Sequence, residues 1–136
     1  MNRFTLTLAA LLLAGSIQAA PTTPTPVSTA ADGWDYSLPA AQLEVLCETT
    51  LSQAKEAFVA IENDTSPATL QGVYGAYDQM MLDLQAIQHV WYLKSVHPDA
   101  QVQAAAEQCI EDYSDFAVTI NLSQSFYRRV AAIDLG

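Results

Sequence analysis

Three sets of apolar residues at helical spacing constrain this chain more than any other feature. Apolar side chains recur every three to four residues over 43–61, 70–91 and 102–120, which places each set on one face of a helix. Breaks that contain proline separate the sets, and no stretch shows the two-residue alternation of a strand. The pattern therefore predicts an all-α chain.

The signals at the breaks predict how the helices begin. Ser66 is the expected N-cap of a second helix that runs from Pro67 to about residue 93. A third helix follows His97-Pro98-Asp99, and Asn121 with Gln124 resembles a capping box that opens a fourth. Since short links favour antiparallel neighbours, we predict an up-down antiparallel helical bundle of three long helices plus a fourth C-terminal helix.

Residues 1–19 have the features of an export signal. Asn2-Arg3 supplies a positive start, and the apolar run over 6–14 is shorter than the ~20 residues that span a bilayer. We expect cleavage after Ala19, with Ala20 as the alternative position and an uncleaved anchor as the less favoured alternative. The protein is thus expected to be exported, periplasmic or secreted, with no membrane association after cleavage.

A Pro/Thr-rich tether is predicted over residues 20–36, before a helical domain over 37–136. Its core, Pro21-Thr22-Thr23-Pro24-Thr25-Pro26-Val27-Ser28-Thr29, has no core-forming pattern, and proline favours an extended, solvated backbone. A ligand for a proline-binding domain is the less favoured alternative.

The charge of the chain excludes one class of partner. The full sequence has a net charge of −10, and loss of Arg3 with the signal leaves 4 basic against 15 acidic residues, a net charge of −11. Phosphate binding needs a basic face, so no nucleic acid is expected as a partner. A hydrophobic content of 51% argues against intrinsic disorder.

The two cysteines can be placed on the predicted helices. Cys47 lies early in the first helix and Cys109 about halfway along the third, and these helices run in the same direction in an up-down arrangement. A rise of 1.5 Å per residue puts the two cysteines only ~5 Å apart in height. An exported chain also meets an oxidising compartment, which favours a disulfide over the alternative of two buried free thiols.

Other candidate sites are weaker. His89 and His97 lack the spacing of a zinc site, and neither cysteine has a patterned histidine partner, so we predict no catalytic and no metal-binding residue. Glu107, Glu111 and Asp115 form an acidic row at four-residue spacing. A solvated face is the usual explanation of such a row, and a cation site or a docking face for a basic partner is the alternative.

The sequence from residue 54 onward also resembles a known family. The matching stretches are Val96-His97-Pro98-Asp99, Ala104-Ala105-Ala106-Glu107 with Cys109, Tyr113-Ser114-Asp115-Phe116, and Phe126-Tyr127-Arg128-Arg129-Val130. They are similar to the N-terminal helical region of the thimet oligopeptidase and neurolysin family of zinc metallopeptidases, which includes oligopeptidase A and dipeptidyl carboxypeptidase.

The resemblance implies a role without catalysis for these helices. In the family they form part of the wall of a channel that admits short peptides, and zinc is held far downstream by an H-E-x-x-H motif. That motif is absent here, so no cofactor is expected in this chain, and zinc only in a missing catalytic region. The remainder of an exported peptidase is then the expected partner. The alternative is a complete, acidic helical module that binds a partner or small ligand.

Overall fold

A computed structural model describes residues 36–134, and 81% of them are helical with no strand among them. The all-α prediction is confirmed for this range. The predicted signal peptide, its cleavage positions Ala19 and Ala20, and residues 20–35 of the predicted tether lie outside it. The elements are α1 (Ala40–Asn63), the π-helical η1 (Gln71–Gly75), α2 (Ala76–Asp83), the 3-10 helix η2 (Leu84–Ile87), α3 (Val90–Val96), α4 (Ala100–Leu122) and α5 (Gln124–Ala131).

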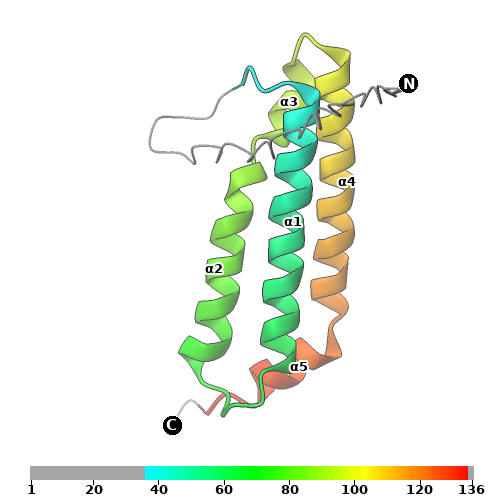
Figure 1. Ribbon diagram of the computed structural model, residues 1–136. Coiled ribbons are helices and arrows are strands. Elements are labelled where there is room, and N and C mark those ends of the chain that lie inside the picture. The colour runs from blue at the N-terminus through cyan, green and yellow to red at the C-terminus, as the bar shows by residue number, and fades with distance from the viewer. Residues whose placement is uncertain (1–35, 135–136) are drawn as a thin grey trace, which may run out of the picture.

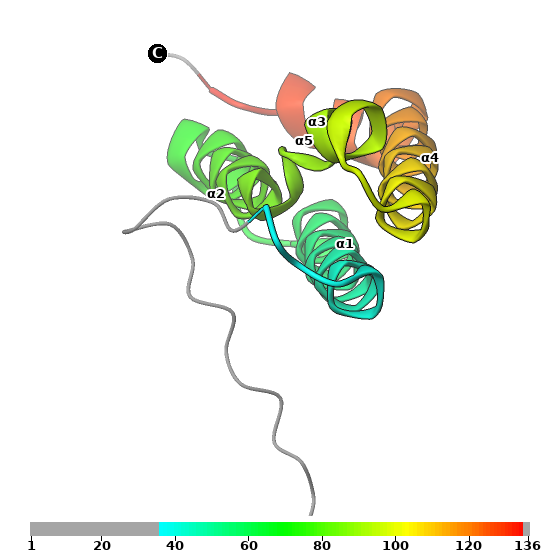
Figure 2. The ribbon, with the colours of Figure 1, turned by 90° about the horizontal axis from the view of Figure 1, so that it is seen from above.

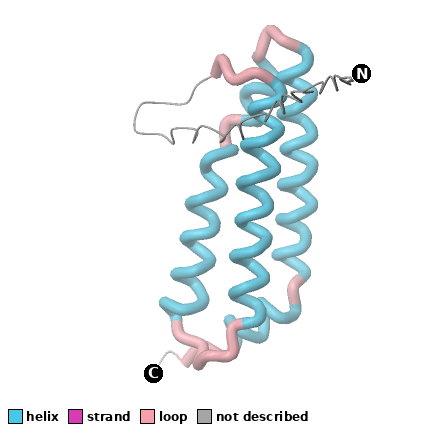
Figure 3. Tube along the Cα trace, in the orientation of Figure 1, coloured by secondary structure: helices cyan, strands magenta, loops and turns pink. Residues whose placement is uncertain are grey.

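The helices gather around one elongated core. Figure 1 shows α1, α2 and α4 side by side, with α3 at one end and α5 lying across the other. Seen from above in Figure 2, α1, α2 and α4 stand around a common centre rather than in a row. The main helix pairs are α1 with α4, α3 with α4, and α1 with α2. Loops lie at the two ends of this group (Figure 3).

The prediction of one continuous helix over 67–93 is wrong. The structure divides this stretch into η1, α2, η2, a turn at Gln88 and His89, and α3. The winding changes where apolar residues recur at every third position, and all four of them are at least 95% buried: Leu84, Ile87, Val90 and Leu93. An α-helix turns about 100° per residue, so it would rotate the last of these about half a turn away from the first. The three-residue turn of η2 helps to keep them on the core side.

Two helix starts also differ from their predictions. Ser66 is not an N-cap, because its N–H and hydroxyl both donate to the Asp64 carboxylate, at 2.9 and 2.8 Å. Helical structure begins after Thr69, whose hydroxyl accepts from the Gly72 N–H at 3.0 Å. Asp64 follows the last residue of α1 and binds both polar groups of Ser66. The serine side chain is therefore not free to cap a helix, which explains why the second helical stretch starts later than predicted.

The capping box at Asn121 and Gln124 is the second difference. Residue 121 still belongs to α4, and the hydroxyl of Ser123 caps α5 by accepting from the Phe126 N–H at 2.9 Å. The boundary therefore lies two residues later than predicted, because the backbone stays helical through Leu122 and becomes extended at Ser123. By contrast, α4 begins where the sequence predicted, with Asp99 accepting from the Gln101 N–H at 2.8 Å.

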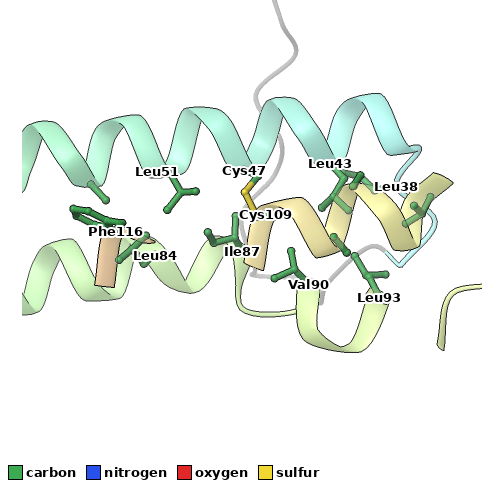
Figure 4. Packing of buried hydrophobic residues seen from close by; sticks show 14 of the residues in the cluster. Leu38, Leu43, Cys47, Leu51, Leu84, Ile87, Val90, Leu93, Cys109 and Phe116 are labelled. Atoms are coloured by element: carbon green, nitrogen blue, oxygen red, sulfur yellow. A yellow bond between two sulfur atoms is a disulfide. The ribbon is translucent and has the colours of Figure 1, made fainter. Parts of the chain in front are cut away.

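The core changes character along its length. Figure 4 shows an aliphatic half, with Leu43, Val90 and Leu93 packed together, and the Cys47–Cys109 pair in the middle. At the other end the Phe58 ring meets Phe116 and Phe126, at centroid distances of 6.0 and 5.4 Å. This aromatic group joins α1, α4 and α5, so the short α5 is held by packing as well as by its cap.

Candidate functional site: the groove between α1 and α4

A groove of about 960 Å³ lies between α1 and α4, and every residue that lines it belongs to one of these two helices. It runs from Ala40 at the start of α1 to Lys55, so it follows fifteen residue steps of that helix, or about 22 Å. Small side chains line much of this length. The groove is therefore long and open, in contrast to an enclosed pocket for a small molecule.

The Cys47–Cys109 disulfide forms part of the wall of the groove. The two Cα atoms are 5.8 Å apart, and both cysteines are almost fully buried, at 4% and 2% exposed. Figure 4 shows the bond joining α1 to α4 beside Leu51 and Ile87. The pair that the helical registers brought together is thus bonded in the structure, and the alternative of two free thiols does not describe it.

The rim of the groove is mainly acidic. Glu44 and Glu48 line it from α1 and Asp112 from α4, all of them exposed, with Lys55 at one end as the basic lining residue. Within residues 36–134, neither glutamate forms an ion pair, and Asp112 accepts a hydrogen bond from the Gln108 amide at 3.1 Å. The groove thus combines an apolar, small-residue surface with uncompensated negative charge.

The acidic row predicted from the sequence lies outside this groove. Glu107, Glu111 and Asp115 are all exposed on α4, but none of them lines the groove. Glu107 forms an ion pair with Lys94 of α3 at 2.8 Å, so the negative charge of one member of the row is already paired. Sequence spacing missed the α1 residues Glu44 and Glu48, whose place beside Asp112 depends on how α1 and α4 pack.

The two histidines lie in separate places, and each contacts a residue near a turn or the start of the domain. The ring of His89 lies edge-on to Tyr36, the last residue of the predicted tether, at 5.8 Å between centroids. His97 accepts from the Asp99 N–H through Nδ1 at 3.1 Å, which shapes the turn before α4. Among residues 36–134, no three His, Cys, Asp or Glu side chains gather closely enough to hold a metal ion.

A polar clasp fixes the other end of the molecule. Arg129 of α5 donates to the Asp64 carboxylate at 2.6 Å and to the Ser66 carbonyl at 2.7 Å, while the Ser123 hydroxyl donates to Glu62. The two hydrogen bonds from Ser66, and then the charge of Arg129, hold the pKa of Asp64 below its usual range. The partners are 65 residues apart in sequence, so no local pattern could reveal the clasp.

A second, smaller hollow of about 200 Å³ lies between α2 and α4. Its lining is largely aromatic and aliphatic and includes Tyr77, Met81, Tyr113 and Ile120. Beside it, the Trp91 ring stands edge-on to Tyr113 at 5.3 Å and remains 43% exposed. The sequence pattern had placed Trp91 in the core stripe, and the altered winding at η2 turns it outward.

Comparison with known proteins finds no matching family model, no similar curated protein and no similar solved structure. Any assignment of function therefore depends on the residues and geometry described above. None of the helices within residues 36–134 combines the length and apolar character needed to cross a membrane.

Proposed function

We propose that residues 37–136 form an up-down antiparallel helical bundle that serves as the N-terminal, channel-wall segment of an exported zinc metallo-oligopeptidase. The motif around His97-Pro98-Asp99 and the helix that follows it suggested this family. In the structure, the motif is the turn between α3 and α4, and Asp99 caps α4. The family has a similar turn after a long helix; in this chain the helix before the turn, α3, has seven residues, and the long helix is α4, which follows it.

The observation that carries the proposal is the apolar surface between α2 and α4. Tyr113, Met81 and Tyr77 line a hollow there, and the neighbouring Trp91 is 43% exposed. A segment that belongs to a larger folded unit exposes apolar and aromatic surface where the rest of that unit packs. We propose that the following part of the peptidase covers this surface.

The bundle would act in the peptidase by shape and not by chemistry. The described residues bring no three metal-ligand side chains together, and zinc with its H-E-x-x-H ligands is proposed to belong to the downstream catalytic region. When bound there, zinc would polarise the scissile carbonyl and activate water. The bundle, whose two longest helices are joined by the disulfide, would supply a stiff part of the channel wall.

Sequencing of the locus beyond codon 136 tests this proposal. We expect an open reading frame that continues in frame to an H-E-x-x-H motif. A stop codon after Gly136 with no such motif would count decisively against it. Export is tested separately by N-terminal sequencing of the secreted or periplasmic protein, for which we expect a first residue at Ala20 or Pro21.

A second candidate is a self-contained, exported acidic module that binds a partner or small ligand without catalysis. It is favoured by the closed core, the disulfide between its two longest helices and the clasp at Arg129. Binding of a hydrophobic dye to the natively folded chain separates the two candidates. The channel-wall proposal expects dye binding that Trp91→Lys reduces, with Val45→Lys as a matched change at an exposed α1 position. The self-contained module expects a monomer that binds no dye.

A further inference from the structure

The shape of the α1–α4 groove suits a helix. Ala40, Ala41 and Ala104 line it with single methyl groups, so another backbone can approach closely. Helices pack at interaxial distances of about 8–10 Å, and the shorter distances require small residues at the contact. The ~22 Å from Ala40 to Lys55 accommodates about four helical turns.

The charge on the rim selects the kind of helix. Glu44 and Glu48 stand one turn apart on α1, and Asp112 lines the same groove from α4. Neither glutamate forms an ion pair within residues 36–134. An anionic or neutral helix would leave these carboxylates uncompensated beside an apolar contact. A helix that carries lysine or arginine on both flanks of an apolar stripe would pair with them.

The direction of the occupant follows from the direction of its neighbours. Both α1 and α4 begin at the same end of the groove, at Ala40 and Ala100. An occupant that runs antiparallel to both places its own C-terminus there, which is favourable for the helix dipoles. Its basic residues then lie in its C-terminal half, opposite Glu44 and Glu48, and an acidic residue in its first turn meets Lys55.

A second copy of this chain does not have the required chemistry. The complete sequence has 5 basic residues against 15 acidic ones, and two such grooves facing each other would bring the same glutamates together. Repulsion between like charges therefore disfavours a homodimer through this face. The complementary occupant is a different, cationic helix.

We propose that the α1–α4 groove is a docking site for a cationic amphipathic α-helix of a protein partner, about four turns long and antiparallel to α1 and α4. The site lies apart from the aromatic hollow between α2 and α4, and it does not depend on the peptidase assignment. A failure of helix docking would leave the sequence of the locus unaffected, so the two proposals can fail independently.

The test uses the purified chain and a fluorescent peptide of about 16 residues that forms a helix. The peptide has an alanine/leucine stripe, a glutamate in its first turn and lysines in its last two turns. We expect saturable binding by fluorescence anisotropy at low salt, weakened by added salt. A scrambled peptide of identical composition is expected to bind at least about tenfold more weakly because it lacks the continuous stripe.

Two pairs of variants locate the site. Ala104→Trp fills the groove and is expected to reduce affinity more than tenfold, while Ala60→Trp on the outer face of α1 leaves it within about twofold. Glu44→Gln with Glu48→Gln is expected to weaken binding about fivefold to tenfold, and the matched pair Glu56→Gln with Asp78→Asn much less. All four acidic positions are exposed, so these variants keep the fold.

Each alternative result overturns the proposal. The first is that the peptide shows no saturable binding up to about 1 mM. The second is that the scrambled peptide binds as tightly as the designed one. The third is that Ala104→Trp binds the designed peptide with the same affinity as wild type. A dimer in analytical ultracentrifugation that Ala104→Trp converts to a monomer would assign the groove to a second copy instead. Circular dichroism of each variant confirms that it is folded.

Discussion

Reduction of the Cys47–Cys109 bond should lower the stability of the domain substantially. The bond joins residues 62 positions apart, and closing a loop of this length reduces the entropy of the unfolded chain. The chain-entropy relation gives about 4 kcal/mol for such a loop at 25 °C. Domains of this kind have a total unfolding free energy of only about 5–15 kcal/mol, so the loss is a large fraction of the whole.

Urea unfolding followed by circular dichroism, with and without a reductant, measures this effect. With a slope of about 2 kcal/mol per molar urea, a loss of 4 kcal/mol lowers the midpoint by about 2 M. Both cysteines are at least 95% buried, so the reductant has to act on transiently open molecules and needs a long incubation. The double variant Cys47→Ala with Cys109→Ala is the control, and its midpoint should not respond to reductant.

Two results would refute the reasoning about the bond. One is an intact mass that shows two alkylated thiols before any reduction, which would mean that the disulfide is absent from the purified protein. The other is a fully reduced wild-type protein whose midpoint falls by less than about 0.5 M, because the loop-closure argument would then overestimate the contribution of the bond severalfold.

Four further predictions concern single side chains. Phe58→Ala should lower the unfolding free energy by about 3–5 kcal/mol in urea titrations, because a ring that is 2% exposed leaves a cavity. Ser123→Ala should cost about 1 kcal/mol in the same assay, because it removes the α5 cap. Lys94→Met should change it by less than about 0.5 kcal/mol, since the ion pair is exposed. The lowered pKa of Asp64 stabilises the fold above the ordinary value of 3.8 and loses that effect as the pH falls through the folded-state pKa. Wild type should therefore lose more stability on acidification than Asp64→Asn.

Matched changes test the reasons behind these expectations. Val59→Ala, next to Phe58 but 51% exposed, should cost far less than the core substitution. Ser125→Ala lies in α5 without capping it and should be milder than Ser123→Ala. Equal acid sensitivity of wild type and Asp64→Asn would contradict the role given to the Asp64 carboxylate. An Arg129→Met variant should keep most of the acid sensitivity of wild type, because the Ser66 hydrogen bonds are the larger cause of the lowered pKa of Asp64.

Much of the fold could be predicted because its signals are local. The apolar stripe of α1 and the start of α4 after His97-Pro98-Asp99 each depend on residues within a turn or two of one another, and both were located correctly. The break at η2 was also encoded locally, in the three-residue spacing from Leu84 to Leu93. The break was missed because Leu84, Ile87 and Trp91 also fit the three-to-four spacing of an ordinary helix. Counting Trp91 as a core residue therefore hid the strict three-residue spacing.

The sequence by itself determined that this chain forms amphipathic helices with defined breaks, carries strong negative charge, and presents two cysteines at compatible heights. Periodicity, turn residues and charge are properties of neighbours along the chain. Only the tertiary structure decided that Glu44 and Glu48 share a groove with Asp112, that Asp64 meets Arg129, and that Trp91 points outward. These relations depend on how helices far apart in sequence rotate and pack against one another, because the apolar stripes specify which faces meet but not which polar residues then become neighbours.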